Sequence, residues 1–296
     1  MNKKERGSFT GGIGFVLAAA GSAVGLGNLW RFPYLAAQYG GGIFILVYII
    51  LALTFGFTLM TTEIAIGRKT KLSPTRAYSE VNKKFGFIGP IAFIIPVIIL
   101  PYYCVIGGWV TKYVTVFATG QNIAAADDSF FGSFVSQEWS PLVFFIIFLG
   151  LTSLIVILGV EKGIERVSKF IMPILLVMVI VIAIFSLTLK TTLDDGTVRT
   201  GLQGMMIYLK PDLTGVTVGR FLQITLDAMS QLFFSLSVSM GIMITYGSYV
   251  KKDVDLNKAV SQIELMDTGV AFLAGVMIIP AVFVFSGLDG MSAGPG

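Results

Sequence analysis

Long stretches of this sequence carry no charged residue, and each is long enough to cross a lipid bilayer. A membrane-spanning helix needs about 20 consecutive apolar residues. Of the 296 residues, 55% are hydrophobic and 13% are charged, against roughly 25% charged residues in a soluble domain. We therefore expect an all-α membrane protein, built on these charge-free runs: 7–30, 32–62, 85–111, 139–160, 170–189, 228–250 and 268–288.

The charge-free runs predict seven transmembrane helices in a single membrane domain, 1–296. The run 32–62 contains the end of one helix and most of the next, because Tyr39-Gly-Gly-Gly42 is typical of a turn. We expect the helices at about 11–37, 42–68, 87–119, 141–159, 167–189, 219–250 and 260–286.

The distribution of Lys and Arg predicts that the N-terminus is cytoplasmic, because cytoplasmic loops of membrane proteins are rich in basic residues. With the N-terminus inside, the alternating loops place 15 loop cations on the cytoplasmic side and four outside. This bias explains the net charge of +4 without a nucleic-acid partner. We expect a multi-pass protein of the plasma membrane. The loop cations left outside are Lys190, Arg199, Lys210 and Arg220.

The composition excludes several kinds of active site. Histidine is absent and Cys104 is the only cysteine. There is therefore no Ser-His-Asp triad, no histidine-ligated zinc and no internal disulfide. Cys104 lies in an apolar run, where we expect a buried, inert thiol. We do not expect an enzyme.

Two predicted helices contain residues that favour an interruption inside the membrane. Gly21, Gly25 and Gly27 lie in the first, and each lowers helix stability by about 1 kcal/mol relative to alanine. Ser235-Leu-Ser-Val-Ser-Met-Gly241 lies in the sixth. Unwound backbone in a bilayer is tolerated where it lines a cavity or binds a ligand. We predict interruptions near 22–27 and 235–241; the alternative is that the glycines only allow close helix packing.

A specific motif surrounds the first interruption, Gly21-Ser-Ala-Val-Gly-Leu-Gly-Asn-Leu-Trp-Arg-Phe-Pro-Tyr34. It resembles the first-helix signature of the neurotransmitter:sodium symporters, and in particular their bacterial amino-acid branch. Further stretches along the whole chain continue the resemblance: Gly40-Gly-Gly-Ile-Phe44, Glu63-Ile-Ala-Ile-Gly-Arg68, Tyr102-Tyr103 with Trp109, Gln231-Leu-Phe-Phe-Ser-Leu-Ser237, Thr245-Tyr-Gly-Ser-Tyr249 and Asp267-Thr268.

The resemblance implies an inverted-repeat transporter fold, made of two repeats of five helices with one or two helices more. The first repeat would cover about 11–189, and the second would begin at about 219–286. We therefore expect a fold truncated after the seventh transmembrane helix. The helices beyond it would carry two hydroxyl ligands of a second sodium site and the acidic partner of Arg31.

The resemblance also implies two sodium sites. The carbonyls of Gly21 and Val24 would face the second site. The Ala23 carbonyl and the side chains of Asn28, Ser235 and Asp267 would face the first. Hard cations prefer such oxygen ligands, and a carboxylate inside a membrane is costly unless a cation accompanies it. The alternative for Asp267 is a helix-end residue near the cytoplasm.

The substrate site and the gate follow from the same resemblance. The amides of Leu26 and Gly27 and the Tyr103 hydroxyl would receive a substrate carboxylate, and Phe234 would cover the substrate beside Ala23 and Ser235. Tyr103 could instead be an ordinary buried tyrosine, and Asp227 either helps to hold Arg31 or is a solvated vestibule carboxylate. We expect Glu63 to bond backbone freed by a broken helix. Ile99, Ser237 and Met240 would line the side-chain pocket, and the outer gate would comprise Arg31, Gln231, Phe234 and Asp227.

Two residues, Gly25 and Asp267, predict the class of substrate and the ions that are needed. In the family's monoamine branch an aspartate occupies the position of Gly25 and binds the amine, whereas glycine leaves that space to a substrate carboxylate. Asp267 supplies a fixed negative charge, so chloride should not be needed. We expect a sodium-coupled symporter that imports a neutral amino acid by alternating access. The alternative is a truncated, non-transporting membrane subunit or scaffold; the sequence leaves open whether the chain forms homo-oligomers.

Overall fold

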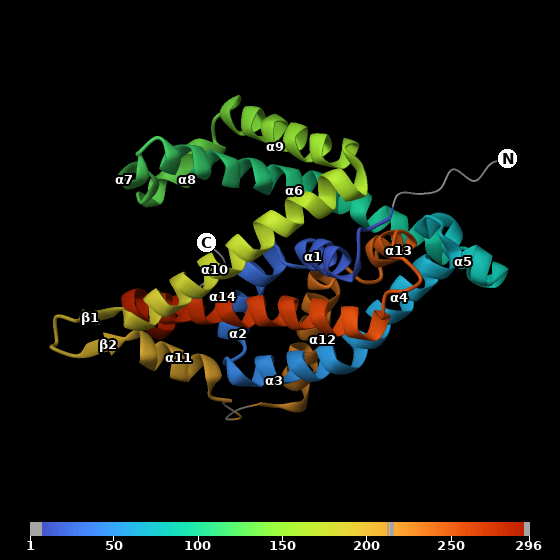
Figure 1. The fold of residues 1–296 in the computed structure, drawn as a ribbon. Helices are drawn as coiled ribbons and strands as arrows, with labels where there is room; N and C mark the ends of the chain where they lie inside the picture. The colour runs from blue at the N-terminus through green and yellow to red at the C-terminus, as the bar shows by residue number, and fades with distance from the viewer. Residues whose placement is uncertain (1–7, 212, 214–215, 293–296) are drawn as a thin grey trace.

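The computed structural model describes residues 8–211, 213 and 216–292, and it is helical over most of its length (Figure 1). Within these residues, five helical segments are long and apolar enough to cross a membrane. A sixth span is formed by Gly12–Ala23 and Gly27–Gln38, which meet at an angle of 53°. The all-α membrane fold is therefore confirmed. The five continuous segments are Gly42–Thr70, Lys83–Ala118, Ser140–Ile157, Val160–Thr188 and Leu256–Gly287.

The predicted helices are present, each with boundaries within a few residues of the expected ones. The predicted helix 219–250 exists as two pieces, α12 and α13, and is not among the spans that qualify by length and hydropathy. In chain order the long helices and their π-helical turns are α1 (Gly12–Ala23), η1 (Gly27–Arg31), α2 (Phe32–Gln38), α3 (Gly42–Leu51), η2 (Ala52–Gly56), α4 (Phe57–Thr70), α6 (Ile88–Ala118), α9 (Ser140–Ile157), η4 (Val160–Glu165), α10 (Arg166–Thr188), α12 (Val218–Ser235), α13 (Ile242–Ser248) and α14 (Leu256–Ser292).

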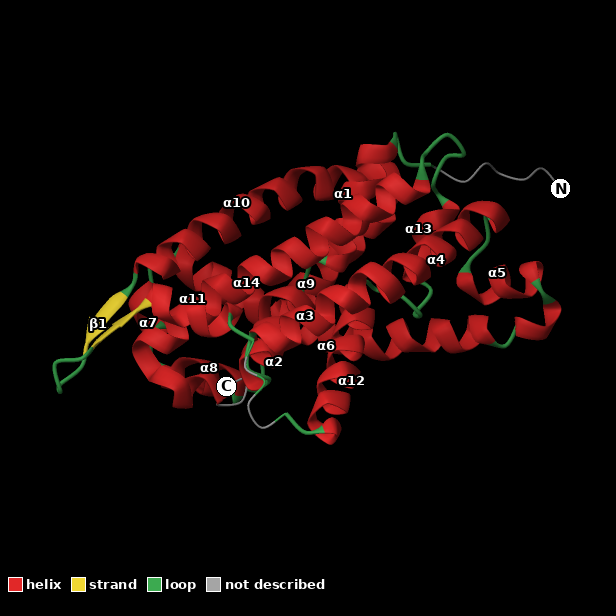
Figure 2. Cartoon of the chain, turned by 90° about the horizontal axis from the view of Figure 1, so that it is seen from below, coloured by secondary structure: helices red, strands yellow, loops and turns green. Residues whose placement is uncertain are grey.

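The loops contain short elements that the charge-free runs did not predict. A two-stranded antiparallel hairpin pairs Lys190 with Thr200 and projects from one end of the molecule (Figure 2). The assignment of 11–189 and 219–286 to two repeats stays a prediction. The short elements are α5 (Pro74–Val81), the 3-10 turn η3 (Lys83–Phe85), α7 (Asn122–Ala125), α8 (Asp128–Val135), β1 (Lys190–Thr192), β2 (Val198–Thr200) and α11 (Gly201–Leu209).

The core lies around α14, which packs against α1, α2, α10 and α11 and runs through the middle of Figure 1. Aromatic rings fill the space between α2 and α3. Phe32 and Tyr48 are buried, and their ring centroids lie 5.0 Å apart. The second half of the first broken helix is thereby packed against α3.

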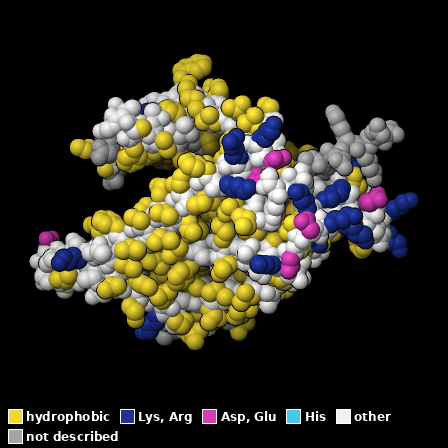
Figure 3. All heavy atoms as spheres, viewed as in Figure 1, with side chains coloured by type: hydrophobic (Ala, Val, Ile, Leu, Met, Phe, Trp, Pro, Cys, Tyr) yellow, Lys and Arg dark blue, Asp and Glu magenta, His cyan; other side chains and the backbone are white. Residues whose placement is uncertain are grey.

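The outer surface is apolar where a bilayer would contact it. In Figure 3, hydrophobic side chains cover the middle of the visible face, whereas Lys and Arg gather at one end of it. None of the apolar side chains of α9 is fully buried. α6 and α9 pack against each other and lie to one side of the other helices over much of their length (Figure 1), although Tyr103 on α6 reaches Phe234 on α12. Such a surface suits lipid tails on its flank and headgroups at its charged end.

Helices α4 and α13 touch through their backbones. A Cβ atom added to Gly67 would lie 2.0 Å from the carbonyl oxygen of Ile244, and one added to Gly247 would lie 2.4 Å from the carbonyl oxygen of Ile64. Two glycines, one on each helix, therefore make the close approach possible.

Gly67→Ala should destabilise the protein, because the added methyl group meets backbone that has no rotamer to change. Overpacking of this kind costs about 1–3 kcal/mol. Gly150→Ala is the matched control, since a Cβ atom at Gly150 on α9 has no neighbour within 4 Å. The thermal unfolding temperature in detergent should be lower than that of the wild type for Gly67→Ala and unchanged for Gly150→Ala. Equal unfolding temperatures for both variants would contradict the packing.

Candidate functional site

Both predicted interruptions are present. Helix α1 ends at Ala23, and the chain resumes a helical course at Gly27 after a bend of 53°. Helix α12 ends at Ser235 and α13 begins at Ile242. Between them Ser237, Ser239 and Gly241 have φ angles of 54°, 64° and 74°, which no α-helix contains.

A glutamate on a neighbouring helix holds the second interruption. The backbone N–H of Ser239 donates a hydrogen bond of 2.6 Å to Oε1 of Glu63. Glu63 lies on α4 and is 5% exposed. Its other oxygen, Oε2, has no hydrogen-bond partner among the described residues. The expectation that Glu63 bonds backbone freed by a broken helix is confirmed.

A buried carboxylate joins the two interruptions. Oδ1 of Asp267 accepts hydrogen bonds from Asn28 Nδ2 at 2.7 Å and from Ser235 Oγ at 2.8 Å. Asn28 Nδ2 also donates to the Asp267 carbonyl at 3.0 Å, and the Tyr48 hydroxyl donates to Oδ2 at 3.4 Å. Asn28 and Asp267 are fully buried. Asp267 is therefore an interior residue of α14, and the helix-end alternative is wrong.

The cluster around Asp267 is rich in oxygen, and within the described residues no basic side chain is hydrogen-bonded to it. Asn28 Oδ1 accepts from the Gly25 amide at 3.0 Å, which fixes the orientation of the Asn28 side chain. Ala23, the fourth residue predicted for this site, is buried at the C-terminal end of α1. This arrangement concentrates one negative charge and several neutral dipoles at the point where three helices meet.

The two residues predicted for a second sodium site lie against α10. A Cβ atom at Gly21 would be 3.1 Å from Ser168 Oγ. Val24 belongs to a small apolar cluster with Met172 and Val270. No hydrogen bond links Gly21 or Val24 to Asp267 within the described residues, so their role as ligands stays a prediction.

A cavity of about 330 Å³ lies beside the interruptions. The rings of Tyr103 and Phe234 on its wall are 6.0 Å apart, and Ser237 Oγ donates to the Ser22 carbonyl at 3.4 Å. Five of the residues predicted for the substrate line the cavity: Ile99, Tyr103, Phe234, Ser237 and Met240.

Four residues predicted to bind substrate do not line this cavity: Ala23, Leu26, Gly27 and Ser235. Gly27 lies behind the aromatic ring, since a Cβ atom there would be 3.0 Å from Phe234, and Ser235 is bonded to Asp267. The Phe234 ring thus lies against Gly27, whereas Ser22, just before the bend in α1, lines the cavity.

Further residues complete the lining: Ser22, Pro96, Leu100, Cys104, Phe148, Thr152 and Ile242. Pro96, Leu100 and Cys104 follow one another at intervals of one helical turn on α6, next to Ile99 and Tyr103. That spacing could have identified them from the sequence. Cys104 is buried, as expected, but it faces the cavity.

Two of the residues predicted for the outer gate, Arg31 and Gln231, are in contact. Arg31 donates to Gln231 Oε1 at 3.5 Å and to Ser230 Oγ at 3.3 Å. Gln231 is fully buried and donates to the Gly27 carbonyl at 2.8 Å. The expectation that Arg31 lies beside Gln231 is confirmed.

Within the described residues, no hydrogen bond or ion pair joins Asp227 to Arg31, contrary to the first of its two predicted roles. It accepts hydrogen bonds from the hydroxyl of Tyr39 and from Gln223 Nε2, the latter at 3.1 Å. Burial first, and then the bond to Asp227, raise the pKa of Tyr39. Asp227 is one helical turn from Gln231, but it faces the turn between α2 and α3.

Comparisons with known proteins give one family. A sequence model described as the sodium:neurotransmitter symporter family matches residues 6–127 and 135–290. An uncharacterized sodium-dependent transporter of Bacillus subtilis, YhdH, is 34% identical over 96% of this chain and 61% of its own length. The human sodium- and chloride-dependent GABA transporter 2 is 26% identical over 99% of this chain and 54% of its own.

A solved structure agrees with the sequence comparison. The crystal structure of MhsT in complex with L-phenylalanine superposes with a TM-score of 0.86 at 37% sequence identity, and covers 99% of this chain and 64% of that one. The chain thus spans less than two thirds of the length of these relatives. The likeness confirms the transporter fold expected from the motifs.

Glu63→Met should destabilise the second interruption, because it leaves the Ser239 N–H without an acceptor. The loss of one hydrogen bond costs about 0.5–1.5 kcal/mol. Glu63→Gln keeps an oxygen in place and should retain most of the stability. The measurement is the thermal unfolding temperature of both variants beside the wild type. If Glu63→Gln and Glu63→Met lower the unfolding temperature equally, Glu63 does not stabilise the protein through this hydrogen bond.

Proposed function

This chain belongs to the sodium:neurotransmitter symporter family, which consists of secondary transporters rather than enzymes, and we propose that it carries the sodium and substrate sites of a sodium-coupled importer of neutral amino acids. The observation that carries the proposal is the buried Asp267 cluster at the two helix interruptions, next to a cavity of substrate size.

The Asp267 cluster has the chemistry that sodium requires. Na⁺ is a hard cation and takes oxygen ligands, and Asp267, Ser235 and Asn28 each have an oxygen close to the two interruptions. The Asn28 amide would have to present Oδ1 rather than Nδ2 to a cation. The charge of Na⁺ would offset the cost of a carboxylate buried among neutral groups. Gly21 and Val24 remain our candidates for carbonyl ligands of a second ion.

The cavity suits an apolar side chain. Ile99, Phe234 and Met240 line it, and none of its lining residues is charged. Methionine adapts to ligands of different shape, so several neutral amino acids should fit. The complex of MhsT with L-phenylalanine supports this class of substrate. The substrate carboxylate would be met by the Tyr103 hydroxyl and by the Leu26 and Gly27 amides once Phe234 moves aside.

Contacts on both sides of the cavity suit alternating access. On the predicted outer side, Arg31 reaches Gln231 and Ser230. On the predicted cytoplasmic side, the Phe9 amide donates to the Tyr249 carbonyl at 3.2 Å, and Lys71 Nζ donates to the Val250 carbonyl at 2.6 Å. We propose that these two groups of contacts open in turn, with the N-terminus in the cytoplasm and the protein in the plasma membrane.

Asp267→Asn should weaken sodium binding by about tenfold or more, because it removes the charge that offsets the cation in a dry site. Asp127→Asn is the control, since Asp127 is exposed in the loop before α8. The measurement is sodium-dependent binding of labelled phenylalanine, in chloride and in gluconate. A second variant, Asp267→Ser, also removes the charge, and chloride should partly restore its sodium-dependent binding of phenylalanine. The wild type should bind without chloride.

Identical sodium curves for the wild type and both Asp267 variants in gluconate would reject the assignment. The absence of any sodium-dependent amino-acid binding by the wild type would favour the alternative, a non-transporting membrane subunit or scaffold.

Bound substrate should shield Cys104 from alkylation, because Cys104 lines the cavity. Cys104 is the only cysteine of the chain, so maleimide labelling reports on this position alone, and Cys104→Ala gives the background. Phenylalanine with sodium should slow labelling several-fold, whereas glutamate or lysine with sodium should not. Equal labelling rates under all conditions would contradict the proposed substrate position.

A further inference from the structure

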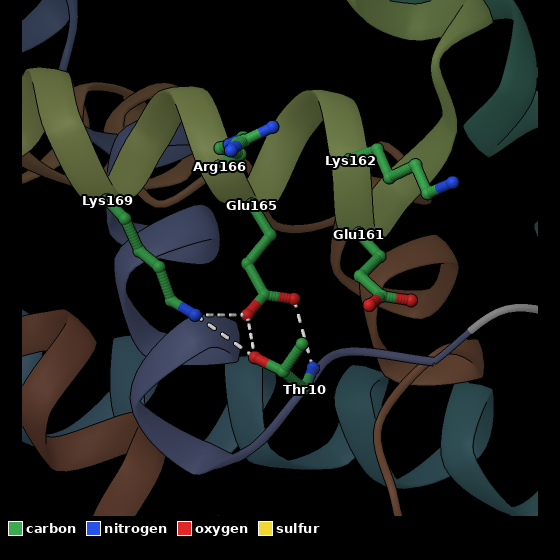
Figure 4. A pocket seen from close by; sticks show the side chains of 6 residues that line it. All are labelled: Thr10, Glu161, Lys162, Glu165, Arg166 and Lys169. Atoms are coloured by element: carbon green, nitrogen blue, oxygen red, sulfur yellow. Dashed lines mark hydrogen bonds and ion pairs between the residues drawn. The ribbon is translucent and has the colours of Figure 1, made fainter.

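A second cavity, of about 270 Å³, lies where η4 passes into α10 (Figure 4). The charged residues of this span are confined to 161–169, and 170–189 carry no charge. The cavity is therefore expected at the membrane surface, at the end where the apolar part of the helix begins. Its lining is Thr10, Glu161, Lys162, Glu165, Arg166 and Lys169.

The charge of Glu165 is satisfied within the protein. Its carboxylate accepts hydrogen bonds from the Thr10 amide at 3.0 Å and from the Thr10 hydroxyl, and it forms a salt bridge of 2.6 Å with Lys169. Glu165 is 1% exposed. A Cβ atom at Gly14 would lie 2.0 Å from Glu165 Oε1, so the glycine provides the space for this carboxylate.

Two cations of the cavity remain available to a ligand. Within the described residues, Lys169 and Glu165 form the single ion pair, and the side chains of Lys162 and Arg166 form no hydrogen bond. Both side chains are exposed and reach away from the Glu165 carboxylate in Figure 4. They lie four residues apart and so share one helix face. Glu161 offsets only one of the two charges.

The same helix face continues as an apolar stripe. Phe170, Ile174 and Val177 follow Arg166 at spacings of four, four and three residues, which keeps them on one side of the helix. All three are exposed, Phe170 by 71%. Two basic side chains at the membrane surface are thus followed by an apolar strip that runs into the hydrocarbon region.

We propose that this face of α10 binds an anionic phospholipid, with the phosphate on Lys162 and Arg166 and one acyl chain along Phe170, Ile174 and Val177. Basic clusters at the cytoplasmic membrane surface attract anionic headgroups, and the adjoining apolar strip distinguishes a lipid from a free anion. The bound headgroup would lie beside Thr10 and the Glu165 salt bridge, and so next to the segment that begins α1.

The test counts lipids retained by the purified protein in native mass spectrometry, with phosphatidylglycerol and phosphatidylcholine as the two probes. The variant is Lys162→Gln with Arg166→Gln. The matched control is Lys83→Gln with Lys84→Gln, a pair of exposed cations in η3. Each cation near an anionic surface changes binding by roughly fivefold, so affinity for phosphatidylglycerol should fall about 25-fold in the variant. Phosphatidylcholine binding should not change.

Three outcomes would overturn the proposal. The first is equal retention of phosphatidylglycerol by the variant and the wild type. The second is an equal loss in the control pair, which would mean that the basic surface as a whole attracts the lipid. The third is displacement of the lipid by millimolar inorganic phosphate, which would mean that the site takes a free anion. Unchanged thermal unfolding of the variant in phosphatidylcholine confirms that it is folded, and none of these readouts requires amino-acid transport.

Discussion

A backbone amide or carbonyl inside a bilayer has no water to bond, so a helix that breaks there needs protein groups to replace its lost hydrogen bonds. This requirement explains the buried polar residues of the structure. Glu63 accepts from the Ser239 amide, Asn28 Oδ1 accepts from the Gly25 amide, and Gln231 donates to the Gly27 carbonyl. These side chains stabilise the two interruptions, and the site formed by both interruptions depends on them.

Asp267 connects the two broken helices through one network of hydrogen bonds. Its carboxylate and its carbonyl both accept from Asn28, which lies beyond the break in α1, while Ser235 bonds to it from the last turn of α12. Three segments far apart in the sequence therefore share one negative charge. Any cation that binds there interacts with both broken helices at once, which is the coupling that a sodium-driven transporter needs.

The parts of the fold that were predictable depend on local sequence. Charge-free runs located the long helices because the bilayer imposes a minimum apolar length, and glycine and serine located the breaks. The family resemblance predicted that Asn28, Ser235 and Asp267 lie close together, and that Arg31 lies beside Gln231. The contribution of Phe148 and Thr152 to the cavity was not predictable, because it depends on how α9 packs against α6. The partners of Asp227 depend on the rotation of α12 about its axis, which the spacing to Gln231 does not determine.

The glycine contact between α4 and α13 has a mechanical consequence. Two helices that touch through Gly67 and Gly247, backbone against backbone, have no side chains between them that could change rotamer and let one helix slide past the other. The contact therefore fixes the position of α13 relative to α4. The positive φ angles at 237, 239 and 241 interrupt the chain just before α13, so the glycine contact and the Glu63 hydrogen bond to Ser239 both tie this end of the broken helix to α4.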